Sequence, residues 1–456
     1  MRVKWLSHLP PEVWVMVFSY LSTQEKHRVR CCCKVLKKLI DHPCLWRNHM
    51  VVLSNFPRYT AGFWDTLTYR RVTRVAVQRL RLKDWKHLVK SLPRLTTIVC
   101  MDGQQHYKKI NVNNLPDFPN LKTLGIRNAT WSEPMLQQCQ TGQLAERLTH
   151  LSVCNIQLPS AAEFVNSVSC LFNLEYLLFH QQAEGKLQVV ELVPSKAFHN
   201  LLLNLRKLKH LSWEIKEKLE EPLPDDYFYP PDPEDPEAYG GPALTSLELV
   251  NYPETMLSEN ALRGLTSLKS LTVRYRYLKI GVKCRLQSWL SHLQQLESLE
   301  IIGGNSLAFY TTTFPPRVTR LVLRVIISLK DLCFIAKKVK KLEHLDMHQN
   351  RFSGSLCKKL PSLFPKLKTL RIRYFLEEPK RDILLLSNLK HLEQLELIVE
   401  RSYILKSDRN DHPWPSPFLQ ELIRELHELS ENRINIITTM RQRNLFQECD
   451  CVWEGD

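Results

Sequence analysis

The chain has 456 residues, of which 44% are hydrophobic and 24% are charged, which allows two or three ordinary domains or one long repeat array. Its formal net charge of +16 predicts affinity for acidic surfaces. No apolar run approaches the roughly 20 residues of a membrane-spanning helix, and the first residues lack the apolar core of a signal peptide. Thirteen cysteines without zinc-finger or redox spacing predict reduced thiols, so we expect a cytoplasmic or nuclear protein with no membrane partner.

The N-terminal residues predict a small helical unit. Leu9 and Pro10 lead into Pro11 and Glu12, which suit a first helical turn because proline needs no N–H partner there and the carboxylate complements the helix dipole. Apolar residues follow at helical spacing from Val13 onward, and a second apolar set precedes the break at proline 43. A piece of about forty residues forms only a marginal core. So many large apolar side chains suggest that another protein completes one face.

This segment resembles the F-box, the adaptor-binding module of Skp–cullin–F-box ubiquitin ligases. The matching residues are Leu9-Pro10-x-Glu12-Val13, Phe18-Ser19-Tyr20-Leu21, Arg28, Cys33-Lys34 and Leu45-Trp46-Arg47. Leu36 stands where a tryptophan is usual, and Lys26 stands where an apolar residue is common, although its ammonium can snorkel to water. The resemblance implies that residues 1–50 bind a Skp-type adaptor, and through it a cullin scaffold, with the contacts Leu9, Pro10, Glu12, Val13, Phe18, Leu21 and Trp46. A generic helical cap on a repeat array is the alternative.

Residues 51–71 predict a connector whose aromatic side chains, Phe56, Tyr59, Phe63, Trp64 and Tyr69, pack between the helical unit and the segment that follows. One short phrase then recurs about thirteen times over residues 72–405. It is clearest at residues 342–352, which match the phrase Leu-x-x-Leu-x-Leu-x-x-Asn-x-Leu of a leucine-rich repeat. The first apolar residues of the phrases, here called anchors, are Val72, Leu95, Leu121, Leu148, Leu174, Leu208, Leu244, Leu268, Leu296, Val318, Leu342, Leu367 and Leu392. Because such units bury their apolar faces only against their neighbours, we predict an α/β solenoid, a horseshoe with parallel strands on its concave face.

Two segments depart from the repeat. Residues 219–241 are rich in proline and carboxylates, which predicts an extruded, mobile loop that is dispensable for folding. Residues 406–456 are expected to form a C-terminal cap, with a helix over residues 418–429 and a closing strand at Ile434 and Ile436.

The sequence contains no phosphate-binding loop, nucleophile elbow or zinc-ligand array, so we expect no catalytic residue, metal or cofactor. His344, Asp346 and His348 alternate along one strand, but the two histidines would lie about 13 Å apart, which is too far for one ion. The lysine-rich run at residues 336–342 is compatible with a nuclear import signal, although an exposed edge of the solenoid explains it better.

Residues that flank the inward apolar positions of each strand are predicted to face outward. In three consecutive phrases these positions carry four arginines and one carboxylate, which indicates local positive charge. The predicted substrate-binding residues are Arg274, Arg320, Arg324, His348, Arg371 and Arg373. Because the arginine fork pairs with carboxylate or phosphate, we predict an acidic or phosphorylated protein substrate. A solvated charged face is the alternative.

The F-box resemblance implies a non-catalytic, substrate-recognition subunit of a ubiquitin ligase, with the repeats holding a protein for ubiquitination and degradation. The competing hypothesis is a leucine-rich-repeat scaffold whose F-box no longer functions. A nucleic-acid partner is disfavoured because no platform of aromatic and basic residues is evident, and an enzyme has the least support.

Overall fold

A computed structural model describes residues 9–47, 49–78, 81–101, 115–130, 143–157, 160–181, 193–215, 222–235, 238–275, 284–347, 356–374, 379–400 and 417–441. The chain divides into two compact units. The first comprises residues 1–208 with 449–456, and the second comprises residues 209–448.

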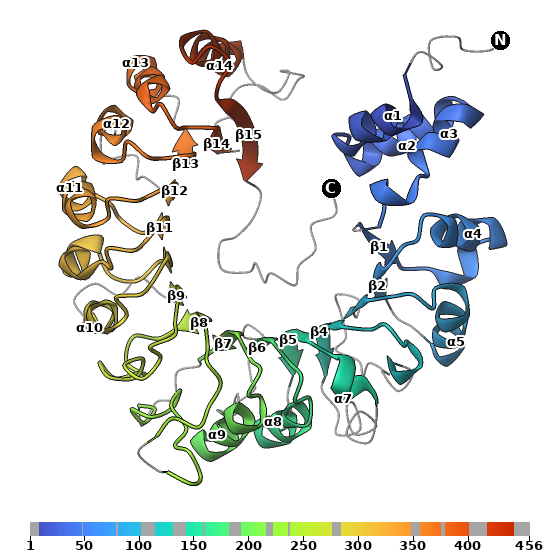
Figure 1. Ribbon diagram of the computed structural model, residues 1–456, viewed down its shortest axis with the longest axis horizontal. Coiled ribbons are helices and arrows are strands. Elements are labelled where there is room, and N and C mark those ends of the chain that lie inside the picture. The colour runs from blue at the N-terminus through green and yellow to red at the C-terminus, as the bar shows by residue number, and fades with distance from the viewer. Residues whose placement is uncertain are drawn as a thin grey trace. The chain divides into compact units, whose positions relative to one another are not determined.

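The first unit opens with the helices α1 (Pro11–Ser19), α2 (Thr23–Cys32) and α3 (Lys34–Ile40), followed by the short turn η2 (Pro43–Leu45) (Figure 1). Proline occupies the first position of α1, where its ring is pre-organised for a helix. Ser22 and Glu25 form a capping box at the start of α2, in which each side chain satisfies the other residue's backbone N–H. The predicted helical unit is therefore present.

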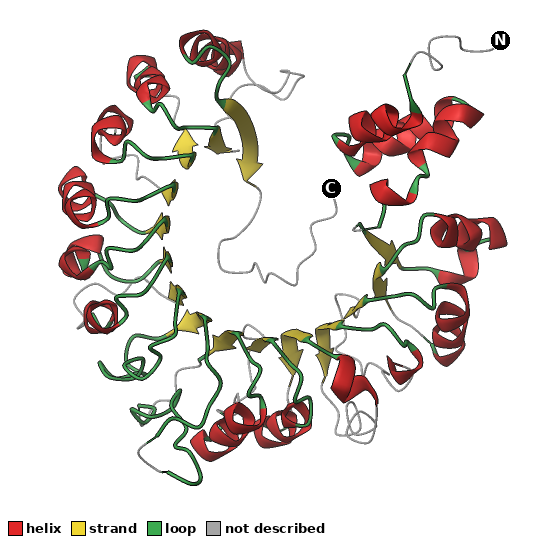
Figure 2. Ribbon diagram, viewed as in Figure 1, coloured by secondary structure: helices red, strands yellow, loops and turns green. Residues whose placement is uncertain are grey.

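A parallel sheet follows in the first unit. Its described strands are β1 (Met50–Leu53), β2 (Arg74–Gln78), β3 (Thr97–Met101), β4 (Thr123–Thr130), β5 (His150–Gln157) and β6 (Tyr176–Gln181), which pair in chain order. The helices α4 (Ala61–Tyr69), α5 (Leu82–Ser91), α7 (Gln143–Arg147), α8 (Ala161–Ser169) and α9 (Ser195–Asn204), with the turns η3 (Phe56–Arg58) and η4 (Leu115–Asp117), alternate with these strands. Figure 2 shows the helices of this unit on one side of its strands.

The second unit repeats the same arrangement. Its described strands are β7 (His210–Glu214), β8 (Ser246–Tyr252), β9 (Ser270–Tyr275), β10 (Ser298–Ile302), β11 (Arg320–Arg324), β12 (His344–Met347), β13 (Thr369–Tyr374), β14 (Gln394–Glu400) and β15 (Asn435–Arg441), which are parallel and pair in chain order. Between them lie α10 (Leu286–His292), η6 (Leu307–Phe309), η7 (Thr311–Thr313), α11 (Leu329–Lys338), η8 (Cys357–Lys359), α12 (Leu360–Leu363), α13 (Lys380–Leu384), η9 (Leu385–Asn388) and α14 (Pro417–Leu429). The predicted C-terminal helix and closing strand correspond to α14 and β15.

The anchors determine where the strands begin. Every one of the thirteen anchors is buried and lies two residues before the start of a strand. The strand register pairs equivalent positions of neighbouring phrases, as with Leu345 and Leu370. Burial of a leucine side chain stabilises the fold by roughly 1.5–3 kcal/mol, so each phrase favours the same in-register stacking. The predicted strand positions are confirmed.

The predicted connector at residues 51–71 contains more structure than expected. It begins within β1, which pairs with β2, and it includes η3 and α4. Phe56, Tyr59, Phe63 and Trp64 pack against one another, with a ring-centroid distance of 4.4 Å between Tyr59 and Phe63. The prediction was wrong for Tyr69, which is exposed.

The acidic, proline-rich segment is packed over its described residues, so the prediction of a mobile loop was wrong. Leu223, Tyr227 and Phe228 are buried. The ring of Tyr229 stacks on Tyr239 with a centroid distance of 4.6 Å. Several aromatic side chains of this segment are thus buried or stacked, although its prolines disfavour regular secondary structure. A proline-rich backbone can still direct side chains into a core.

Gly264 provides a test of this packing. A Cβ added there would lie 2.0 Å from the ring of Tyr229. Gly264→Ala should therefore displace this ring and lower the free energy of unfolding by about 1–3 kcal/mol. Gly62→Ala is a matched control, since Gly62 lies in α4 with no atom near the added Cβ, and it should stabilise by roughly 0.5–1 kcal/mol. Urea denaturation measures both changes. Equal free energies of unfolding for Gly264→Ala and the natural chain would show that the acidic, proline-rich segment is not tightly packed at Tyr229.

Candidate functional site

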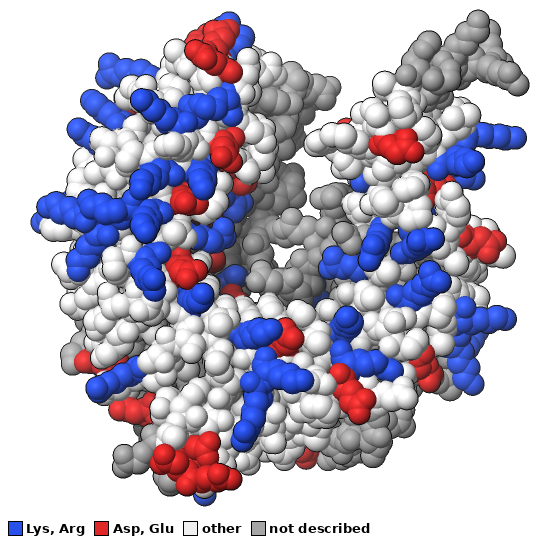
Figure 3. Space-filling model, in the orientation of Figure 1, with Lys and Arg blue, Asp and Glu red and all other residues white. Residues whose placement is uncertain are grey.

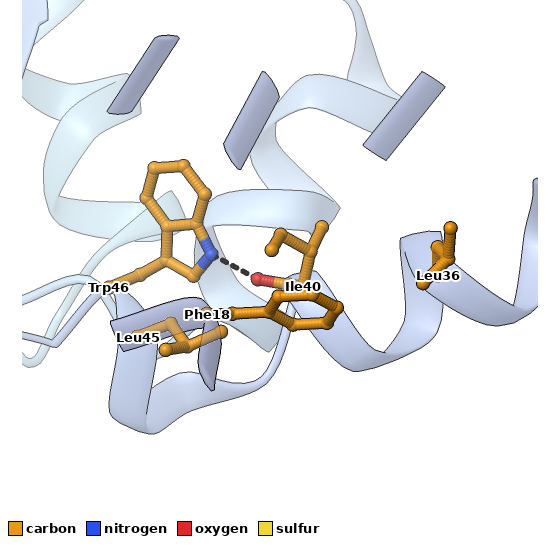
Figure 4. Packing of buried hydrophobic residues seen from close by; sticks show 5 residues of the cluster. All are labelled: Phe18, Leu36, Ile40, Leu45 and Trp46. Atoms are coloured by element: carbon orange, nitrogen blue, oxygen red, sulfur yellow. Dashed lines mark hydrogen bonds between the residues drawn. The ribbon is translucent and has the colours of Figure 1, made fainter. Parts of the chain in front are cut away.

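The three N-terminal helices close over one small core. Phe18, Leu36, Ile40, Leu45 and Trp46 form this core, and the indole N–H of Trp46 donates to the carbonyl of Ile40 at 2.5 Å (Figure 4). Leu36 takes an interior place, so its substitution for the usual tryptophan leaves an apolar core. Phe18 and Trp46, predicted as adaptor contacts, are only 4% and 6% exposed. Both side chains lie in the core beneath the predicted adaptor-binding surface and are not part of that surface.

An apolar stripe runs along the exposed side of α1. Val13, Met16, Val17 and Tyr20 are 37%, 62%, 44% and 80% exposed. Their spacing of three, four and seven residues places them on one side of the helix. We call these four residues the α1 stripe. Met16, Val17 and Tyr20 were not among the predicted contacts, although the helical spacing from Val13 could have identified them.

The other predicted adaptor contacts lie near the α1 stripe in the sequence. Leu9 is 42% exposed, and Pro10 and Glu12 are also exposed. Leu21 is half-buried and packs against the core of the three helices. Val35 on α3 adds a further exposed apolar side chain, at 55%. Scattered apolar side chains are ordinary on a protein surface, but a row of them along one helix is typical of a docking surface.

Lys26 does not snorkel, contrary to the prediction. Only 2% of it is exposed, and its Nζ lies 3.2 Å from Nε2 of His49 and 6.0 Å from the centre of the Trp46 ring. A nitrogen acceptor and an aromatic face thus accommodate the buried ammonium. The departure from the apolar pattern at this position therefore leaves the helical unit intact.

Asp41, directly after α3, joins the helical unit to α4. Its carboxylate accepts hydrogen bonds from Nε of Arg30 at 2.9 Å and from Nε of Arg70 at 2.8 Å. The guanidinium of Arg70 also lies 3.7 Å from the centre of the Trp46 ring. Burial by itself would raise the pKa of Asp41, but the hydrogen bonds from both arginines outweigh it and hold this pKa below its ordinary value. The junction between α3 and α4 is therefore a buried ionic contact.

In the second unit, two of the predicted substrate-binding arginines are held by carboxylates. Asp346 lies between them, 3.3 Å from Arg324 and 3.4 Å from Arg371. Arg371 also contacts Glu396 at 3.1 Å, and Glu396 accepts a hydrogen bond from Thr439 at 2.9 Å. These side chains form a continuous ionic network over β11 to β15.

A second network surrounds Arg274. Its guanidinium lies 2.8 Å from Glu248 and 3.8 Å from Glu300. Ser212 donates a hydrogen bond of 2.6 Å to Glu248. The predicted local excess of positive charge is therefore largely neutralised, because acidic side chains on neighbouring strands pair with Arg274, Arg324 and Arg371.

The remaining predicted residues have different surroundings. Arg320 is exposed and Arg373 is half-buried, whereas His348 lies outside the described residues. Glu248, Glu300 and Glu396 were not among the predicted site residues, although each stands four residues after its anchor, as Asp346 and Arg371 do. Comparison of this position in every phrase would have identified these charged residues as neighbours on adjacent strands.

Three other observations concern the chemistry of the chain. Across the described ranges, no cluster of three or more His, Cys, Asp or Glu side chains could hold a metal ion, and no helix has the length and apolarity to cross a membrane. Several cysteines of the described part are free thiols, and two of them, Cys100 and Cys357, are buried.

Comparison with known proteins bears on the helical unit. A search of curated proteins found no match to this chain. Residues 6–51 match the model of the F-box-like family. The matched range covers α1 to α3, their common core and the α1 stripe. The comparison thus supports an F-box-like domain at residues 6–51 of this chain.

Proposed function

We propose that this chain is the non-catalytic, substrate-recognition subunit of a Skp–cullin–F-box ubiquitin ligase. In this proposal, the F-box-like domain binds a Skp-type adaptor, which joins the chain to a cullin scaffold. The observation that carries the proposal is the coincidence of the family match with the exposed α1 stripe. An adaptor that covers this stripe would remove the apolar side chains from water, which is favourable.

We propose further that residues 72–405 are leucine-rich repeats that bind a protein substrate, with residues 406–456 as their cap. The constant offset of anchors and strands and the parallel register support this assignment. Asn128, Asn155 and Asn251 add support, because each has a left-handed backbone near the end of its strand, with φ between 51° and 54°. The amide of Asn155 donates to that of Asn128 at 2.6 Å, so these two asparagines connect neighbouring phrases, whereas the amide of Asn251 donates to Glu214 at 2.7 Å.

The substrate would meet a surface with both signs of charge. Arg320, Arg324, Arg371 and Arg373 remain our proposed contacts, together with Arg274 and His348. An acidic or phosphorylated segment must compete with Asp346 for two of these arginines. We therefore expect that a substrate with basic groups beside its acidic groups is favoured, since it can pair with the displaced carboxylates.

Adaptor co-purification tests the proposed function. Val17→Asp should reduce recovery of a Skp-type adaptor at least tenfold, because burial of a valine is worth roughly 1.5–3 kcal/mol and a charge at an apolar interface is unfavourable. Leu9→Ala combined with Pro10→Ala should have a similar effect. Phe172→Asp is the control, since Phe172 is 48% exposed in the same unit but lies outside residues 6–51. It should leave recovery unchanged.

Two outcomes would count against the ligase role. If adaptor recovery survives both changes, the α1 stripe is not the docking surface. If no adaptor is recovered even with the natural chain, a protein-binding scaffold with a non-functional F-box becomes the better proposal. A positive result should be accompanied by ubiquitinated proteins that co-purify with the natural chain and not with Val17→Asp.

A further inference from the structure

The outer side of α11 carries lysines that no described carboxylate neutralises. Lys330 and Lys337 on α11, and Lys341 three residues after its end, are exposed. None of them forms an ion pair with a described residue. The acidic residue within this helix, Asp331, is buried and occupied in the capping box with Ser328. The positive charge of this surface is thus available to a partner.

An aromatic ring lies between two of these lysines. Phe334 is 37% exposed, and its ring centre lies 6.0 Å from Nζ of Lys330 and 5.4 Å from Nζ of Lys337. Lys358 and Lys359 on η8, directly before the neighbouring helix α12, are also exposed. Figure 3 shows basic side chains gathered on this side of the second unit, at the left of the view. We call Lys330, Phe334, Lys337, Lys341, Lys358 and Lys359 the α11 ridge.

This ridge contrasts with the strand side of the same unit. There the arginines are held by Asp346, Glu248 and Glu396, whereas lysines of the ridge interact with an aromatic face. Two lysines nearby are already used, since Nζ of Lys338 donates to the carbonyl of Thr312 and Nζ of Lys340 donates to that of Ala336. Acidic groups therefore meet less competition on the ridge than on the strands.

We propose that the α11 ridge is a docking site for an acidic polypeptide segment that carries an apolar side chain between two carboxylates. Lys330 and Lys337 are seven residues apart, which is about 10.5 Å along a helix. In the polyproline II conformation three residues complete one turn and span about 9 Å. Carboxylates at the first and fourth positions of a peptide in this conformation thus lie on one side and match the two ammonium groups, and an apolar side chain between them can reach Phe334.

The geometry favours a peptide over other polyanions. The two ammonium groups lie close to the Phe334 ring, so a nucleic-acid base would have to displace them before it could stack on this ring. A membrane surface favours apolar side chains that project past the basic ones, and Phe334 is more than half covered. This proposal goes beyond the ligase role and does not depend on adaptor binding.

The helix α5 provides a closely matched control. Both α5 and α11 have ten residues, begin with Leu-Lys-Asp, carry lysine at the second and ninth positions and use the third residue in a capping box. In α5 these lysines are Lys83 and Lys90. At the sixth position α5 has His87, whose ring packs on Trp64 at 4.8 Å. The two helices thus differ mainly in the aromatic ring between the lysines and in the basic residues nearby.

The experiment measures binding of a fluorescein-labelled peptide, three repeats of Glu-Leu-Ser-Glu, to the full chain at 50 mM salt. Lys330→Glu with Lys337→Glu should weaken binding at least tenfold, and Lys83→Glu with Lys90→Glu less than twofold. Phe334→Ala should weaken binding about threefold, but should not affect a peptide in which serine replaces each leucine. The milder pair Lys330→Gln and Lys337→Gln, with thermal melting of every variant, separates lost binding from lost folding.

Other outcomes would overturn the proposal. Equal losses in the α5 and α11 variants would mean that the peptide responds to net charge alone. If a twelve-nucleotide uridine RNA binds more tightly than the peptide, and the α11 variant loses this binding, the ridge is a nucleic-acid site. If vesicles with about 30% phosphatidylserine behave in this way, the ridge is a membrane-binding site. Absence of any peptide binding to the natural chain would also refute it.

Discussion

Replacing Asp41 by asparagine is expected to lower the free energy of unfolding of the first unit by about 3–5 kcal/mol, the usual cost of breaking a buried ion pair. The carboxylate of Asp41 is 8% exposed and the side chain of Arg70 is 12% exposed. Removal of the negative charge leaves Arg30 and Arg70 facing each other with little water to screen them. The amide of asparagine preserves the shape of the site, so the loss reports on charge.

The effect of pH on this contact has a definite sign. Because the pKa of Asp41 is lowered in the folded chain, its contribution to stability is present above about pH 4, the ordinary aspartate value. It is lost as the pH falls through the lowered pKa. The difference in the free energy of unfolding between the natural chain and Asp41→Asn should therefore shrink in strong acid.

Urea denaturation of the full chain, followed by tryptophan fluorescence, measures the change. Asp65→Asn is the control, since Asp65 is exposed on α4, and a surface change of this kind is expected to stay within about 0.5 kcal/mol. If Asp41→Asn is as mild as this control, the junction between α3 and α4 owes its stability to apolar packing and not to the ionic contact.

Glu254→Gln is expected to make the second unit more stable at pH 8 than the natural chain, by about 3 kcal/mol. Glu254 is 5% exposed, and its Oε1 accepts a hydrogen bond of 2.5 Å from the backbone N–H of Arg285. Burial raises its pKa to about 7, against the opposing effects of Arg285 and of the phenol of Tyr275. The neutral acid is therefore the form that the folded chain prefers.

The sign of the pH dependence follows from proton binding. Between about pH 4.5 and pH 7 the folded chain binds a proton at Glu254 that the unfolded chain has released. The stabilisation is complete below about pH 4.5 and is lost as the pH rises through 7. A difference of about 2.5 pKa units corresponds to about 3 kcal/mol, and glutamine, which does not titrate, avoids this loss.

Denaturation of both chains at pH 5, 6, 7 and 8 measures the effect as a difference, which removes contributions from other titrating groups. The curves should converge towards pH 5 and separate as the pH rises. Glu297→Gln is the control, because Glu297 is 53% exposed and its ion pair with Lys269 is on the surface. A constant difference between Glu254→Gln and the natural chain from pH 5 to pH 8 would show that Glu254 does not titrate in this range.

Local patterns in the sequence determined most of the architecture. The anchors predicted where thirteen strands begin, because alternating apolar residues can be buried on one face only if the segment is extended. Helical spacing and an opening proline predicted α1 in the same way. The short strand β1 was missed, since four apolar residues between two helical segments have no repeat phrase to identify them.

The tertiary structure decided which groups meet across the repeats. Arg371 contacts Asp346 and Glu396, which are 25 residues before and after it in the chain. Tyr229 packs at Gly264, and Asp41 pairs with Arg70, over similar separations. Residue type and periodicity determine whether a side chain faces the core or the solvent. The partner of a charge, and hence its pKa and its availability to another molecule, depends on the register between distant segments. Comparison of the phrases indicates this register inside the repeats, as for Arg371, but no local pattern predicts the contacts of Asp41 and Tyr229.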